Sequence, residues 1–232
     1  MTFAGASPVL ALAGVAKAFV APSGSHVVLD GVDLEVRPGE VVAIAGRSGS
    51  GKTTLLSVIT GWDAPDSGSI EFLGVPLRAD RPWQELAILP QSLGLLDELT
   101  VAENVLLPLR LASPVSAAAG GENEDPQGLL ADLGIAHLAD RYPSEVSLGE
   151  QQRAALARAA VLRPALLVAD EPISHQNREW AEVMVVLLGR LAALGTACVL
   201  ATHNEIAFVG ADRILELADG RLQPRSTTEV EA

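Results

Sequence analysis

The sequence predicts an α/β fold with a parallel-sheet core, an antiparallel β region on its N-terminal side and an inserted helical subdomain. Three observations favour this fold. Short β-like apolar runs dominate the first part of the chain, and further on such runs alternate with segments of helical periodicity, as in a parallel sheet. With 232 residues, of which 49% are hydrophobic and 19% charged, the chain is long and apolar enough to bury a sizeable core.

The N-terminal part is predicted to form short strands followed by one helix. The strands are expected at residues 9–12, 27–29, 32–36 and 41–45. The last strand ends at Gly46, and a helix follows from Lys52 through Ile59. A turn at residues 65–68 then leads into a strand-like run at residues 69–73.

The rest of the chain is predicted to be helical first and mixed afterwards. Residues 100–163 have helical periodicity, interrupted at 114–127 by a segment rich in Ala, Gly, Glu and Pro that predicts an exposed loop. Later elements are a strand at 165–169, a helix at 178–194, a strand at 196–202, and a hairpin over 213–221 that turns at Asp219 and Gly220.

These elements indicate three regions. Residues 1–91 and 164–222 are expected to form the α/β core together with the antiparallel β region. Residues 92–163 are expected to form the helical subdomain. The polar residues 223–232 show no periodicity, and we expect them to be a frayed, flexible tail.

Composition excludes several classes of function. The net charge is −13 and Lys and Arg form no run, so we expect no nucleic-acid partner. Cys198 is the single cysteine, which excludes an internal disulfide framework or a multi-cysteine zinc site and suits a reducing cytosol. The most apolar stretch, residues 183–200, contains Arg190 and does not predict a membrane span. Residues 1–12 lack the basic region of a secretory signal, so we expect the chain to stay in the cytoplasm.

A phosphate-binding loop is the most specific motif in the chain. It follows an apolar strand, opens a helix and reads Gly46-Arg47-Ser48-Gly49-Ser50-Gly51-Lys52-Thr53, with Thr54 next. Glycines at these positions let backbone N–H groups turn toward phosphates, and the helix start adds partial positive charge. Lys52 is predicted to reach the β- and γ-phosphates and Thr53 to bind Mg²⁺. A plain glycine-rich turn is the alternative, but Lys52 is one of only two lysines among 16 basic residues. The motif predicts a P-loop NTPase core, but not which class of NTPase.

A pair of carboxylates ends a second apolar strand. Asp170 and Glu171 follow the run 166–169, and ligands of parallel sheets gather at the carboxyl ends of the strands. Asp170 is therefore predicted to hold Mg²⁺ through water, and Glu171 to accept a proton from an attacking water molecule. An acidic pair can also simply end a strand, so the roles given to these two residues depend on the presence of the phosphate-binding loop in the same chain.

A second helix start can also bind an anion. Ser147 and Glu150 have the spacing of a capping box at the beginning of a helical run, with Gly149 between them. The N–H groups and dipole of such a helix end attract phosphate oxygens. One nucleotide could then be bound between two subunits. An ordinary capped helix would have the same sequence pattern and is the alternative.

Taken together, these motifs resemble those of the ATPase subunits of ABC transporters, over nearly the whole length. In that family the phosphate loop, Gln loop, signature, carboxylate strand and switch His occur in this order. The signature corresponds to residues 146–150, in which Leu148 replaces the first glycine of the family pattern. The resemblance implies ATP and Mg²⁺ as ligands and a homo- or heterodimer that sandwiches two ATP molecules. It also implies a transmembrane permease partner that holds the chain on the inner face of the cell membrane.

The resemblance assigns roles to three further residues. Gln91 matches the Gln loop, which contacts Mg²⁺ and the attacking water and lies beside the surface that meets the permease. His203 matches the switch histidine that contacts the γ-phosphate. Phe19 corresponds to the aromatic residue that stacks on adenine, although packing in the core is the alternative for Phe19.

Some positions depart from the family pattern. After Glu171 the family usually continues toward an apolar residue and an Asp, where this chain has Gln176 and Asn177. Leu148 places a bulky side chain where a backbone should approach the opposite ATP. These departures leave open an ATP-binding subunit with weak or no hydrolysis, and a soluble non-transport ABC ATPase is a further alternative. Residues 95–105 are similar to those of the lipoprotein-release and macrolide-export group.

Overall fold

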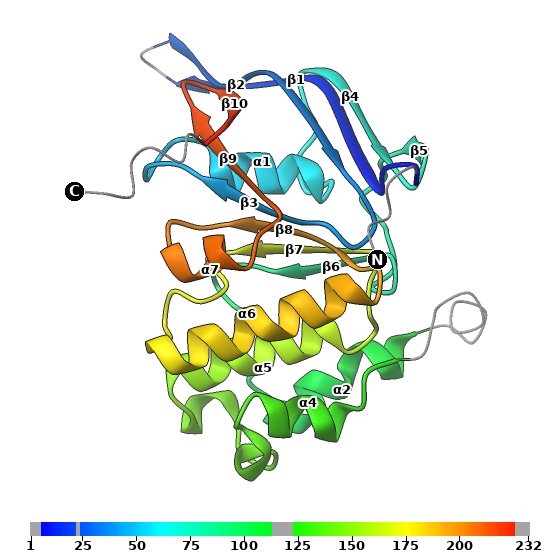
Figure 1. Cartoon of the computed structure of the whole chain (residues 1–232), viewed down its shortest axis with the longest axis vertical. Coiled ribbons are helices and arrows are strands. Elements are labelled where there is room, and N and C mark those ends of the chain that lie inside the picture. The colour runs from blue at the N-terminus through cyan, green and yellow to red at the C-terminus, as the bar shows by residue number, and fades with distance from the viewer. Residues whose placement is uncertain (1–5, 22–23, 113–122, 226–232) are drawn as a thin grey trace.

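The computed structural model describes residues 6–21, 24–112 and 123–225 and consists of two sheets with helices between and below them (Figure 1). The four-stranded antiparallel sheet has the order β2 (Gly24–Val36), β1 (Leu10–Ala21), β4 (Ser67–Phe72), β5 (Val75–Pro76). The six-stranded sheet has the order β10 (Arg221–Pro224), β9 (Arg213–Ala218), β3 (Val41–Ala45), β8 (Ala197–Ala201), β7 (Leu166–Asp170), β6 (Leu86–Leu89). All neighbours in the second sheet are parallel except β10 and β9.

The helices occupy two layers. Helix α1 (Lys52–Ile59) lies between the two sheets, and its buried leucines share one apolar core with both of them (Figure 1). The opposite face of the six-stranded sheet packs against the other helices. These are α2 (Val101–Leu111), α4 (Pro126–Asp132), α5 (Leu148–Ala160), α6 (Arg178–Ala193) and α7 (Glu205–Val209), with 3₁₀ turns at Ala136–Leu138 and Pro143–Glu145.

Complete burial explains why the central strands read as continuous apolar runs. Every residue of β3, β7 and β8 is buried, because helices cover both faces of this sheet. The three strands lie side by side, and their carboxyl ends meet at one edge. This edge carries Gly46 after β3, Glu171 after β7 and Thr202 after β8. The predicted α/β fold is therefore confirmed, including the antiparallel sheet on the N-terminal side.

The N-terminal strands are longer than predicted. The expected strand at residues 9–12 is the start of β1, and the two at 27–29 and 32–36 are one continuous β2. Register shifts occur between Leu12 and Ala18, where Gly14 has a φ of 58°. Bulges of this kind bend a strand without ending it, so glycines that look like turn residues in the sequence lie within strands here.

Two other boundaries were wrong. The loop expected at 114–127 extended too far, because α4 begins at Pro126 with Asp125 as its N-cap. Residues 223 and 224 do not belong to a tail as expected, because Gln223 pairs with Glu216 and Pro224 with Leu215 in the β10–β9 ladder. Most of both predicted segments, residues 114–122 and 226–232, lies outside the described residues.

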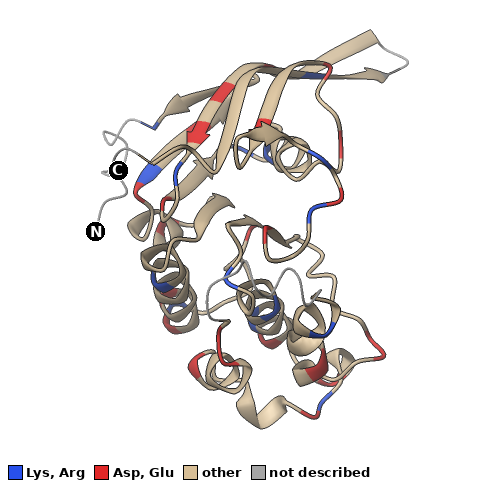
Figure 2. Ribbon diagram, turned by 90° about the vertical axis from the view of Figure 1, so that its right-hand side faces the viewer, with Lys and Arg blue, Asp and Glu red and all other residues tan. Residues whose placement is uncertain are grey.

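The hairpin at Asp219 and Gly220 was predicted correctly, and β9 and β10 flank it. In the described ranges no helix is both long and apolar enough to cross a membrane. Figure 2 shows positions of Lys and Arg interspersed with positions of Asp and Glu over the sheets and helices.

Candidate functional site

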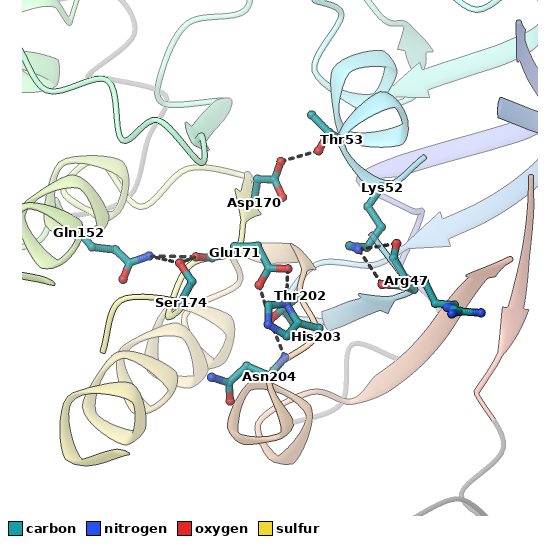
Figure 3. A network of polar contacts seen from close by, with 11 residues as sticks. Arg47, Lys52, Thr53, Gln152, Asp170, Glu171, Ser174, Thr202, His203 and Asn204 are labelled. Carbon is teal, nitrogen blue, oxygen red and sulfur yellow. Dashed lines mark hydrogen bonds and ion pairs between the residues drawn. The ribbon is translucent and has the colours of Figure 1, made fainter. Parts of the chain in front are cut away.

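The phosphate-binding loop joins β3 to α1 as predicted. Gly51 has a φ of 101° and is the N-cap of α1, so the first N–H groups of the helix have no side-chain cap. Lys52 curls back over the loop, where its Nζ donates hydrogen bonds of 2.7 Å to the Gly46 carbonyl and 3.3 Å to the Arg47 carbonyl (Figure 3). An ammonium group held over free helix-end amides is suited to a polyphosphate.

The glycines of the loop are required by close contacts. A Cβ at Gly46 would lie 2.6 Å from Ser50 Oγ and 2.8 Å from the Leu217 carbonyl oxygen. A Cβ at Gly51 would lie 2.7 Å from a methyl group of Val28. The Ser50 hydroxyl is buried and has no hydrogen-bond partner in the described part of the chain. The loop is thus packed tightly against Val28 and Leu217, and it carries a buried hydroxyl group without a hydrogen-bond partner, which fits a bound anion.

Thr53 and Asp170 bring two oxygen atoms together beside the loop. Thr53 Oγ1, in the first turn of α1, donates a 2.9 Å hydrogen bond to Asp170 Oδ2 at the end of β7. Burial raises the pKa of Asp170, which is 8% exposed, and the hydrogen bond from Thr53 opposes that rise. Hydroxyl and carboxylate oxygens are hard ligands of the kind that Mg²⁺ prefers, so this pair fits the predicted metal. Among the described residues no cluster of three His, Cys, Asp or Glu side chains offers a different metal site.

Glu171 and His203 meet because β7 and β8 are neighbours. His203 Nδ1 lies 2.7 Å from Glu171 Oε1, and Thr202 Oγ1 donates a 3.1 Å hydrogen bond to Glu171 Oε2 (Figure 3). Glu171 has a φ of 50°, a left-handed conformation that turns its side chain away from that of Asp170. The His203 side chain is 75% exposed, whereas that of Glu171 is only 12% exposed. This arrangement holds a carboxylate in place and leaves the histidine free to reach a ligand.

One open cavity of about 780 Å³ joins most of the predicted site residues. It is lined by the P-loop together with Phe19, Gln91, Asp170, Glu171 and His203. Gln91 also lines a neighbouring cavity of about 410 Å³, together with Thr53 and Asp170. The structure therefore brings together residues from five separate segments of the sequence.

Phe19 lies on β1 at the edge of this cavity and is 45% exposed, so it is not part of the apolar core. Lys17 lies 5.6 Å from the centre of its ring and is itself bound to Asp63 by a 2.8 Å ion pair. A half-exposed ring at the cavity edge can stack on a flat aromatic ligand.

The signature segment, residues 146–150, does not line the cavity. Ser147 is the N-cap of α5, and it forms the predicted capping box with Glu150. The Ser147 hydroxyl donates a 2.8 Å hydrogen bond to the Glu150 carboxylate and the Ser147 N–H donates one of 2.7 Å, and these two bonds lower the pKa of Glu150. Ser147, Gly149 and Glu150 thus belong to a different surface from the P-loop of the same chain.

Several side chains at the site were not predicted. Two of them, Thr202 and Ser174, donate hydrogen bonds to Glu171. The cavity is also lined by His26, Val28, Ser174 and His175. The sequence signal for Thr202 was its position at the end of the strand predicted at residues 196–202. The histidines had no partner in the sequence that pointed to the site.

Comparisons with known proteins show which family the chain resembles. The family model for ABC transporters matches residues 29–174. A lipoprotein-releasing system ATP-binding protein of Xanthomonas oryzae is 36% identical over 233 residues, covering 97% of this chain and 94% of that protein. The corresponding protein of Porphyromonas gingivalis is 39% identical over 207 residues, covering 86% of this chain and 93% of its own length. The similarity of residues 95–105 to the lipoprotein-release group is in line with these relatives.

Solved structures show the same fold. A dimeric ATP-binding cassette in a post-hydrolysis state, bound to ADP and phosphate, superposes with a TM-score of 0.81 at 27% identity, covering 94% of this chain and 97% of that one. A nucleotide-free cassette from an ABC transporter superposes with a TM-score of 0.74 at 27% identity, covering 93% and 89%.

Proposed function

The chain belongs to the ATP-binding subunits of ABC transporters, and we propose that it binds ATP with Mg²⁺ and hydrolyses it to drive a membrane permease. The observation that carries this proposal is the single cavity that joins the P-loop to Asp170, Glu171 and His203. A cavity that only bound a nucleotide would not need a carboxylate held in place beyond the phosphate site.

The P-loop accounts for phosphate binding. The free amides of α1 and the Lys52 ammonium supply positive charge at one end of the cavity, and the half-exposed ring of Phe19 lies on the strand that borders it. Adenine would stack on Phe19 while the β- and γ-phosphates lie in the loop formed by residues 46–54. On phosphate binding, Lys52 would exchange its two backbone acceptors for phosphate oxygens.

Thr53 and Asp170 would hold Mg²⁺, and Gln91 lines the same cavity. When bound, this ion withdraws charge from the phosphate oxygens. The Asp170 carboxylate would bind it through water, and the Thr53 hydroxyl would turn from Asp170 toward the ion.

Glu171 would accept the proton of the attacking water. Thr202 holds one carboxylate oxygen at 3.1 Å, and His203 holds the other at 2.7 Å. A carboxylate held in this way needs little rearrangement before it acts as a general base. His203 is exposed enough to contact the γ-phosphate as well, so it would link the state of the nucleotide to the position of Glu171.

Two copies would complete each site. Ser147 and the first turn of α5 do not line their own P-loop cavity, so a nucleotide that they contact would be held by another subunit. Closing of the dimer on ATP and opening after hydrolysis would supply the motion that the permease uses.

The permease would dock on the surface beside Gln91. A cavity of about 450 Å³ lies next to the one that Gln91 lines, and Trp62, Trp83 and Leu96 are among its walls. All three side chains are exposed large hydrophobic groups. An apolar hollow that adjoins the nucleotide site is suited to transmit the closure of the dimer. Docking there would hold the chain at the inner face of the membrane.

Weak hydrolysis is a second candidate, because Leu148 is 48% exposed at the first turn of α5. A large apolar group there would separate the helix end from the opposite ATP. Asn177 keeps the capping function of an Asp, since its Oδ1 accepts a 3.0 Å hydrogen bond from Trp180 N.

Turnover of ATP by the purified chain with and without Mg²⁺ tests the proposal. We expect Mg²⁺-dependent release of phosphate that Lys52→Ala abolishes, and co-purification with a coexpressed permease that Trp83→Ser weakens. Phosphate release equal in Lys52→Ala and wild type would contradict the proposal.

A further inference from the structure

Gln152 links the signature helix to the backbone of Glu171. This side chain lies in the second turn of α5 and is 1% exposed. Its Nε2 donates hydrogen bonds of 2.9 Å to the Glu171 carbonyl and 3.3 Å to Ser174 Oγ (Figure 3). Its Oε1 accepts a 3.2 Å hydrogen bond from the N–H of His175. One buried amide is therefore bound to Glu171, Ser174 and His175, in the segment that follows β7.

Gln176 makes the reciprocal connection from that segment to α5. Its Nε2 donates hydrogen bonds of 2.9 Å to the Gly149 carbonyl and 2.9 Å to Gln152 Oε1. Its Oε1 accepts a 2.9 Å hydrogen bond from Arg153 Nη1. Each amide group thus both donates and accepts, and we call this pair of side chains the glutamine clasp.

Arg153 makes the clasp sensitive to the loss of Gln176. Its side chain is 7% exposed, its guanidinium lies 4.4 Å from the centre of the Trp180 ring, and burial lowers its pKa. Within the described ranges Arg153 forms no ion pair, although the Glu150 charge acts on it from a greater distance, and Gln176 Oε1 is its one hydrogen-bond acceptor. Removing that acceptor would leave a largely buried guanidinium group without a hydrogen-bond acceptor.

The start of α5 also touches this segment directly. A Cβ at Gly149 would lie 2.9 Å from the His175 carbonyl oxygen, so the two backbones are in close contact. The clasp and this contact fix the first two turns of α5 relative to the peptide that carries Glu171.

We propose that Gln152 and Gln176 are positioning residues, which lock the start of the signature helix to Glu171 within one subunit. This inference rests on the proposed function: Glu171 acts on the ATP of its own subunit, while Ser147 and Gly149 contact the ATP of the other. The clasp then connects the two nucleotide sites, because a movement of α5 that follows one ATP shifts the carboxylate at the other.

Two variants of Gln176 separate positioning from stability. Gln176→Leu removes every hydrogen bond of the side chain at nearly the same volume. Gln176→Glu restores an acceptor for Arg153 but cannot donate to Gly149 or Gln152. Gln223→Leu is the matched control, because Gln223 is exposed on β10, far along the chain from α5.

The test combines the single-turnover rate of radiolabelled ATP hydrolysis, the Kd for Mg-ATP and the melting temperature. We expect both Gln176 variants to lose at least about tenfold in rate, since small misplacements of catalytic groups have effects of this size or larger. Their Kd should stay at the wild-type value, and Gln176→Glu should melt close to the wild type. A wild-type rate in either variant, or a loss that appears in Kd alone, would overturn the proposal. If the wild type does not bind Mg-ATP at all, the proposed function fails instead.

Discussion

Thr53 Oγ1 donates a 2.9 Å hydrogen bond to Asp170 Oδ2, across 117 residues of sequence. The contact joins the first turn of α1 to the carboxyl end of β7. It therefore connects the phosphate loop to the strand that ends in Asp170 and is followed by Glu171. The proposed chemistry depends on this junction, because metal and phosphate ligands must be placed together before hydrolysis can occur.

Glu171→Gln should abolish hydrolysis and keep nucleotide binding. The amide retains the shape of the side chain but cannot accept the proton from water, and general-base catalysis contributes about 10²–10⁴-fold. We expect the single-turnover rate to fall by about 10²-fold or more, with Kd for Mg-ATP within about twofold of wild type. Equal hydrolysis by Glu171→Gln and wild type would remove Glu171 from the reaction.

Leu148→Gly should speed hydrolysis. Under the proposed function, the exposed leucine at the start of α5 would hold the helix end away from a nucleotide on the other subunit, and glycine removes the side chain. We expect kcat to rise by about tenfold, which corresponds to about 1.4 kcal/mol of barrier. Asn177→Asp tests the other departure in the same assay, and it should keep the cap of α6. Rates indistinguishable from wild type in both variants would show that neither residue limits turnover.

Arg158→Leu should destabilise the chain and displace the segment after Gln91. Arg158 is 7% exposed and donates hydrogen bonds of 2.6 Å to the Gly94 carbonyl and 2.7 Å to the Leu93 carbonyl. Leaving these carbonyls unsatisfied should cost about 1–3 kcal/mol in the free energy of unfolding measured by urea. Arg178→Leu is the control, because Arg178 is 85% exposed and its ion pair with Glu182 should contribute less than about 1 kcal/mol. Similar losses in the two variants would argue against a special role for Arg158.

Cys198 should report nucleotide binding through its reactivity. Burial, with a contribution from Asp212, raises the pKa of this thiol to about 12, so it stays protonated and unreactive in the native state at neutral pH. Labelling by an aromatic disulfide reagent should therefore require unfolding. At 100 times Kd, Mg-ATP should add about 2.7 kcal/mol of stability and slow labelling by about 100-fold. Labelling that is fast and insensitive to nucleotide would contradict this burial.

The sequence predicted local features of the fold well. The strand 41–45 and the helix from Lys52 through Ile59 match β3 and α1, because an apolar run, a glycine loop and a helix start are all encoded within about 20 neighbouring residues. Helix α7 was not predicted, since its five residues are too short for a helical period to show.

Features that depend on the order of strands could not be predicted. Glu171 and His203 are 32 residues apart and meet because β7 pairs with β8. Gln176 and Gly149 are 27 residues apart, and their hydrogen bond depends on how α5 packs against the segment after β7. A glutamine has no periodicity or spacing that marks such a contact. The candidate site residues were therefore predicted from motifs, while their mutual hydrogen bonds became visible only in the fold.

Calorimetric titration of the chain with ATP in the presence of Mg²⁺ tests the central claim most directly. The account predicts saturable heat with one site per chain that disappears in Lys52→Ala, while Lys17→Ala still binds. Absence of heat in the wild type, or equal heat in Lys52→Ala, would contradict the assignment of the P-loop as the nucleotide site.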